Sequence, residues 1–109
     1  PHIVSMLDAC DALILECNHD AGLLAASSYS PSLKRRIAGR FGHLENKMSA
    51  SLLSRLETGK LQHIVAAHLS EQNNRPSLAT QALSAVLGCA PDWIGVASQE
   101  EGLDWRQIL

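Results

Sequence analysis

The chain lacks a strong excess of charge, a long apolar run and any internal repeat. Its 109 residues carry 9 Lys and Arg against 11 Asp and Glu, which gives a formal net charge of −2. This balance provides no broad electrostatic attraction to nucleic acid or to an anionic membrane surface. No apolar run approaches the roughly 20 residues that cross a bilayer, and no signal-peptide pattern is present. We therefore expect no membrane span. Because 46% of the residues are hydrophobic, the chain is expected to form one globular core.

Paired cysteines are also lacking. Cys10, Cys17 and Cys89 are odd in number and do not have the spacing of a metal site. We expect them to be buried free thiols in a reducing compartment, with the cytoplasm as the default location. The chain begins with Pro1 and no Met, where a first helical turn is expected, because the missing N–H of Pro costs nothing there. This start suggests the latter part of a longer polypeptide.

The pattern of apolar residues predicts an α/β order of elements. Helices are expected at residues 2–10, from Pro31 to about residue 40, and at 76–87, with a helical turn at 20–28. A further helix is expected after residues 43–46, with Met48 on its apolar side. Strands are expected at 11–17, 62–67 and 92–98, with a final edge strand at 102–109 reached through a hairpin.

Local signals refine these elements. Ser30 is a plausible N-cap with Pro31 at the first helical position, and Gly88 is placed to end the helix that begins near residue 76. Leu13, Ile14 and Leu15 follow one another in the first strand. Such a run indicates that both faces of the strand are covered, as in a layered α/β sheet.

The stretch with the most chemical information ends the second strand at His68. In α/β proteins the catalytic groups sit where strands end, because the loops there diverge while the sheet holds them in place. A neutral imidazole at such an edge can bind a metal ion. His63 lies on the same strand and, by strand periodicity, is expected to face the other way. A surface histidine without a ligand is the plainer interpretation of His68.

Three segments in this order resemble successive motifs of the metallo-β-lactamase-fold hydrolases, and among them the YycJ/WalJ-like branch, which is related to ribonuclease Z. They are Glu16-Cys17-Asn18-His19-Asp20; Leu33-Lys34-Arg35-Arg36-Ile37 with Gly42-His43-Leu44; and Ala67-His68-Leu69-Ser70-Glu71-Gln72-Asn73-Asn74. The resemblance runs over nearly the whole chain. It implies that residues 1–109 are the C-terminal half of a single domain, an αββα sandwich whose mixed sheet is flanked by helices.

The resemblance also implies a dinuclear centre of two divalent metal ions, zinc or manganese, in the full-length protein. Only the last metal-binding histidine of the family falls within this chain, on His68, so we expect no bound metal in the fragment alone. His43 matches a histidine that hydrogen-bonds the scissile phosphate or the leaving group. A second candidate catalytic residue is His19. Four further residues are expected to contact the substrate or to orient the ligand: Glu16, Asp20, Ser70 and Asn73.

Each assignment has a structural alternative. His43 could cap a helix entry, His19 could be a satisfied loop histidine, and Ser70 could serve the turn after the strand. The basic cluster Lys34-Arg35-Arg36 could line a nucleic-acid backbone or form a solvated helix face.

Two functions therefore remain open. The first is a metal-dependent hydrolase, acting on phosphodiesters in nucleic acid. The second is a non-catalytic α/β binding or remnant module with structural histidines. In the first case an apolar sheet face is left open in this chain, and it is covered by the N-terminal half of the same domain or by self-association.

Overall fold

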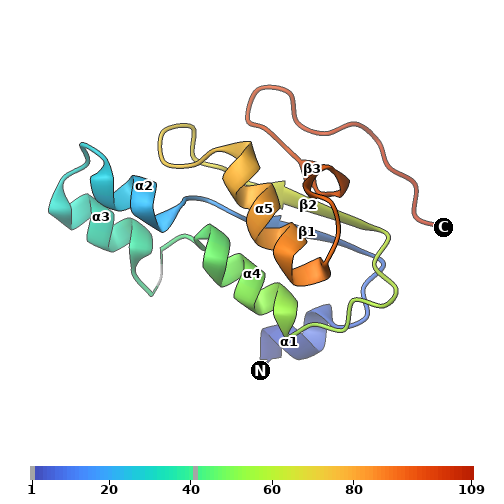
Figure 1. Ribbon diagram of the computed structural model, residues 1–109. Helices are drawn as coiled ribbons and strands as arrows, with labels where there is room; N and C mark the ends of the chain where they lie inside the picture. Colours follow the sequence, from blue (N-terminus) through green and yellow to red (C-terminus); the bar gives the residue numbers. More distant parts are fainter. Residues whose placement is uncertain (1, 41) are drawn as a thin grey trace.

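The computed structural model describes residues 2–40 and 42–109 as an α/β arrangement (Figure 1). Its elements, in chain order, are α1 (His2–Leu7), β1 (Ala12–Glu16), α2 (Ala21–Ala26), α3 (Pro31–Ala38), α4 (Asn46–Ser54), β2 (His63–Ala67), α5 (Pro76–Leu87), the 3-10 helix η1 (Pro91–Trp93) and β3 (Gly95–Val96). The α/β class expected from the sequence is confirmed. The αββα half-sandwich is a finer statement, and it stays a prediction.

The three strands form one parallel sheet in the order β1-β2-β3. Its register pairs Glu16 with Ala67, the last residues of β1 and β2. Because parallel strands end at the same edge of a sheet, the loops that follow β1 and β2 meet there. The mixed sheet expected from the sequence is wrong for the described residues, since no antiparallel strand joins this sheet.

The missing antiparallel strand is the one expected at 102–109. Residues 103–109 have no regular secondary structure. The turn itself begins as predicted, because Ser98 and Gly102 form an isolated antiparallel bridge and Gly102 has a φ of 64°. A strand needs a neighbouring edge of sufficient length. β3 does not offer one, because the turn at Pro91–Trp93 takes up the start of the expected strand and leaves only Gly95–Val96.

Helices α4 and α5 pack against each other and cover one face of the sheet (Figure 1). The strand residues on that face are all at most 6% exposed: Leu13, Leu15, Ile64 and Ala66. Burial of these side chains with Leu53 of α4 and Leu83 of α5 forms the core. This core fixes the strands, and through them the loops at their carboxyl ends.

The opposite face of the sheet is only partly covered. Val65 is buried there, and the C-terminal segment lies over it, with Arg106 beside Gly95. The ring Nε2 of His63 lies 2.8 Å from the main-chain oxygen of Gln107 and helps to hold this segment. Ile14, the register partner of Val65 on β1, is 72% exposed. The expectation that both faces of β1 are covered is therefore wrong for the described structure.

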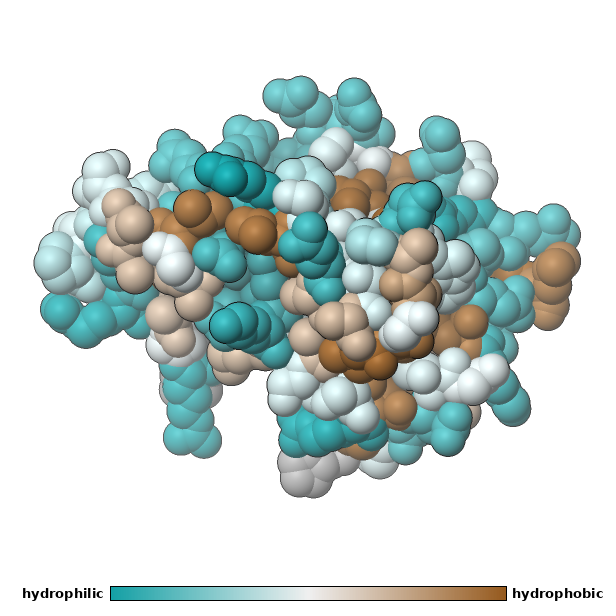
Figure 2. All heavy atoms as spheres, viewed as in Figure 1, coloured by the Kyte–Doolittle hydropathy of each residue, from teal (hydrophilic) through white to brown (hydrophobic). Residues whose placement is uncertain are grey.

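Apolar side chains are also exposed on the C-terminal segment, among them Trp105 and Leu109. Figure 2 shows hydrophobic atoms gathered at the edge of the molecule where Figure 1 places the C-terminus. The open apolar sheet face expected from the sequence is therefore limited to Ile14 on the strands, and the other exposed apolar side chains named here belong to the C-terminal segment. What covers it, the rest of the domain or a second copy, stays a prediction.

The helix ends follow the predicted signals. The Ser30 hydroxyl accepts a hydrogen bond from the Leu33 amide at 3.2 Å, and α3 begins at Pro31. Helix α5 ends at Gly88, which has a φ of 69° that L side chains rarely adopt. One expectation on α4 is wrong, because Met48 is 52% exposed and lies outside the core.

The three cysteines are free thiols, as expected. Only Cys17 is buried, and its burial raises the pKa of the thiol to about 11, which keeps it protonated at neutral pH. The expectation of burial is wrong for Cys10 and Cys89, which are half-buried. Among the described helices, none is both long and apolar enough to cross a membrane.

Candidate metal centre

Three loops meet at the carboxyl edge of the sheet: those that follow β1 and β2, and the one that enters α4. Main-chain hydrogen bonds join them. The Ser70 amide donates to the Asn18 carbonyl at 2.6 Å, and the Asn18 amide donates to the Leu44 carbonyl at 2.9 Å. The Asp20 amide donates to the Asn73 carbonyl at 2.8 Å. The side chains on these loops are therefore held by a continuous backbone network and not by the sheet alone.

A buried pair of amide side chains, Asn46 and Asn74, lies inside this network. Each donates to the other at 2.9 Å, so the two amides form a closed ring. Asn74 also donates to the Cys17 carbonyl at 2.7 Å and accepts from the Arg75 amide at 2.9 Å. Every donor and acceptor of the Asn74 side chain is thus used, and three of these four hydrogen bonds connect its loop to the other two.

The carboxylate of Glu16 is the centre of the site. It accepts a hydrogen bond from the Leu44 amide at 2.8 Å, lies 2.9 Å from Nδ1 of His68, and lies 3.4 Å from Nδ1 of His43. The two imidazole rings are 6.5 Å apart. Ligand atoms of Glu16, His43 and His68 all lie within 4.8 Å of one another.

The backbone places His68 at this centre in an uncommon conformation. Strand β2 ends at Ala67, and His68 has a φ of 60°, in the left-handed region that few residues other than glycine adopt. The side chain of His68 is 73% exposed. A strained, exposed histidine is a common mark of a functional position.

The electrostatics favour an ionised carboxylate. Partial burial of Glu16 favours its neutral form, but hydrogen bonds from His68, the Leu44 amide and His43 outweigh this, so the pKa of Glu16 is lowered. A carboxylate only accepts hydrogen bonds, so Nδ1 of His68 carries the proton. In a neutral imidazole this leaves a lone pair on Nε2. The result is a histidine oriented by a carboxylate, the arrangement typical of histidine metal ligands.

The residues fit a divalent metal ion. One carboxylate and two imidazoles form a donor set that suits zinc or manganese. The sequence assigned only His68 as a ligand; the structure adds Glu16 and His43 as groups within reach of the same ion.

His19 does not belong to this cluster. It is 2% exposed, and its Nδ1 lies 3.2 Å from the side-chain oxygen of Asn18. The main-chain carbonyl of His19 accepts from the Asn46 amide at 2.9 Å, which ties the loop after β1 to the start of α4. These contacts account for His19 as a structural residue, and its catalytic role stays a prediction.

Burial lowers the pKa of His19 by more than the nearby charge of Glu45 raises it. The folded state therefore binds this proton less readily than the unfolded chain. Stability is expected to fall as the pH drops below the ordinary histidine pKa of about 6.5. Urea unfolding of the protein between pH 7.5 and 5.5 measures this slope. In His19→Gln the slope should be shallower; an unchanged slope would show that His19 is not the source of the pH dependence.

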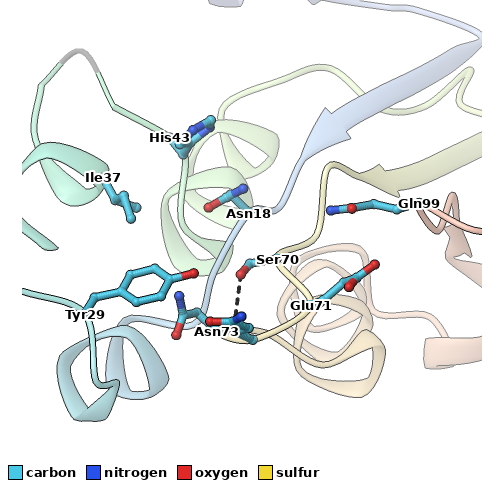
Figure 3. A pocket seen from close by; sticks show the side chains of 9 residues that line it. Asn18, Tyr29, Ile37, His43, Ser70, Glu71, Asn73 and Gln99 are labelled. Atoms are coloured by element: carbon cyan, nitrogen blue, oxygen red, sulfur yellow. Dashed lines mark hydrogen bonds between the residues drawn. The ribbon is translucent and has the colours of Figure 1, made fainter. Parts of the chain in front are cut away.

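The remaining candidate residues separate into two groups. Asp20 accepts from the Leu23 amide at 3.0 Å as the N-cap of α2, which accounts for it structurally. Ser70 and Asn73 line a cleft next to His43, as Figure 3 shows. The sequence did not identify the other lining residues, Tyr29 and Gln99 among them, because their contribution depends on how distant loops come together.

The fold and the cluster define an α/β protein with a carboxylate and two histidines at the carboxyl edge of a parallel sheet. The chain is similar to exodeoxyribonuclease YycJ of Bacillus anthracis, with 37% identity over 82 residues, 75% of this chain and 31% of that protein. It is also similar to exodeoxyribonuclease WalJ of Streptococcus pneumoniae, with 32% identity over 94 residues, 86% of this chain and 35% of that protein.

These matches confirm the resemblance to the YycJ/WalJ branch. The chain spans about a third of the length of these curated relatives. No family model matches the chain. No solved structure matches it either.

Proposed function

We propose that this chain carries the catalytic edge of a metal-dependent hydrolase that cleaves phosphodiesters in DNA. The observation that supports it most is the short hydrogen bond between Glu16 and His68, which leaves the other ring nitrogen of an exposed histidine available to a metal ion. The relatives are named exodeoxyribonucleases, which supports the choice of DNA.

Two divalent metal ions, zinc or manganese, would complete the centre. His68 would hold one of them through Nε2, the ring nitrogen that does not face Glu16. When bound, such ions supply an activated water and stabilise charge on phosphoryl oxygens. The other ligands would come from the remainder of the domain, of which residues 1–109 would form the C-terminal half.

Two residues of this chain would act beside the metal, one by orienting its ligand His68 and the other by donating a hydrogen bond to the substrate. Glu16 accepts from Nδ1 of His68 and fixes the tautomer and direction of that ring. His43 lies beside the same carboxylate with a side chain that is 47% exposed, so it can donate a hydrogen bond to a phosphate oxygen or to the leaving group.

The basic cluster contributes less than its sequence suggests. The ammonium group of Lys34 donates to the Ala25 carbonyl at 2.8 Å and joins α3 to α2. Arg35 and Arg36 are exposed. We therefore assign contact with the DNA backbone to these two arginines.

The test is metal analysis of the full-length protein, followed by assays on single-stranded DNA, duplex DNA, RNA and bis-p-nitrophenyl phosphate. We expect bound zinc or manganese, and cleavage of DNA that is lost with a chelator and restored by the metal. A protein without metal and without hydrolysis of any of these substrates would instead support the non-catalytic module with structural histidines.

His43→Ala is expected to lower turnover by roughly 10²- to 10³-fold with the metal content unchanged, because His43 is proposed to stabilise the transition state. His2→Ala is the matched control, since His2 is exposed on α1. Turnover and metal content are measured on the same preparations. Loss of metal in His43→Ala would make His43 a ligand and not a donor to substrate.

A further inference from the structure

We propose that the cleft next to His43 is a nucleobase subsite, which holds the base of the nucleotide adjacent to the cleaved phosphate. The position of this base next to a cleaved phosphate rests on the proposed function, whereas the recognition of a base rests on the cleft alone. The cleft has a volume of about 330 Å³, within the range of small-molecule sites, roughly 300–1,000 Å³. It opens beside the metal centre, because His43 belongs to both.

One wall of the cleft offers a surface for stacking. Tyr29 extends into it from the loop between α2 and α3, with its hydroxyl toward Ser70, and Ile37 of α3 lies next to it (Figure 3). Tyr29 is half-buried, and its ring makes no side-chain hydrogen bond with the described residues. Aromatic rings of this kind stack with any nucleobase, since every base has a π-face.

The floor of the cleft offers an unused amide. Asn73 is only 3% exposed, yet its side chain has no hydrogen-bond partner among residues 2–40 and 42–109. No side-chain polar atom in this part of the chain is both sealed from solvent and unpaired, so the amide of Asn73 opens into the cleft that it lines. Its neighbour Asn74 is used completely by the protein.

The opposite wall adds another acceptor. Gln99 donates its amide to the Leu69 carbonyl at 3.1 Å, which directs the side chain and leaves its oxygen available. An amide that can both donate and accept matches the edge of a base, which presents a donor and an acceptor side by side.

The charges of the cleft argue against a phosphate in this position. Among the described residues no Lys or Arg lines it, and its acidic residue Glu71 would repel an anion. A flat, neutral group with hydrogen-bonding edges fits this lining better. The phosphate would then lie at the neighbouring metal centre, with the base in the cleft.

The test compares two probes that differ only in the base: deoxyadenosine monophosphate and 2-deoxyribose 5-phosphate. Their dissociation constants are measured by calorimetry with the full-length protein as purified; neither probe contains a phosphodiester bond, so no cleavage is needed. We expect the nucleotide to bind at least roughly tenfold more tightly than the sugar phosphate. Equal or undetectable binding of the two probes would overturn the proposal, even if the protein cleaves DNA.

The variants Tyr29→Ala and Asn73→Ala should each reduce this ratio several-fold and leave binding of the sugar phosphate unchanged. Tyr29→Phe should keep the ratio, because the ring is what stacks. Trp105→Ala is the matched aromatic control, since Trp105 is fully exposed on the C-terminal segment. Variants that weaken both probes equally would give these residues a purely structural role. Failure of the hydrolase proposal would appear separately, as absent metal and absent cleavage.

Discussion

Replacing His68 by alanine in the full-length protein is expected to abolish phosphodiester hydrolysis and to lower the metal content. His68 is the residue whose free ring nitrogen is proposed to bind the metal, and Glu16 holds its ring at 2.9 Å. Loss of a metal that contributes several kcal/mol to transition-state stabilisation lowers turnover by roughly 10³-fold or more. Turnover on DNA and metal per protein are measured together.

His63→Ala is the matched control, and it should retain activity. The sequence separated the two histidines by strand alternation, but the structure gives a different reason. His63 begins β2 and lies against the Gln107 carbonyl, whereas His68 follows the last residue of the strand. Five residues of strand separate them by about 16 Å. Equal loss of activity from both substitutions, with folding intact, would contradict the assignment of His68 to the metal.

Much of the local structure could be predicted because its causes are local. Ser30, Pro31 and Gly88 set helix ends through their own backbone and side-chain chemistry, and the structure confirms them. The segment 102–109 has the alternating pattern of a strand, but pairing depends on the length of a neighbouring edge. That length was reduced by the turn at Pro91–Trp93, whose effect depends on tertiary context.

The candidate site, too, could be predicted only in part from the sequence. His68 and His43 could be selected from the sequence, because each is a histidine among polar residues after a regular element. The central position of Glu16 could not, because it depends on the register that places the end of β1 beside the end of β2. The contrast between Asn73 and Asn74 was equally hidden, since adjacent identical residues differ only in what folds around them.

The difference between Asn73 and Asn74 supports the second large effect that we expect, a loss of stability in Asn74→Ala. Asn74→Ala removes an amide with four hydrogen bonds and leaves the buried Asn46 amide and the Cys17 carbonyl without their partners. A buried polar group without a partner costs about 1–3 kcal/mol, so the loss in unfolding free energy should be on the order of 3 kcal/mol. Urea denaturation of the full-length protein, followed by circular dichroism, measures it.

Asn73→Ala is the matched control at the adjacent position. Its side chain bonds to none of the described residues, while its backbone bonds to Ser70 and Asp20 do not depend on the amide. It should therefore cost less than about 1 kcal/mol. Asn46→Ala should resemble Asn74→Ala, and the double variant should cost less than the two single changes together, because both remove the same ring. Additive losses, or a stable Asn74→Ala, would show that the three loops are held by their backbone bonds alone.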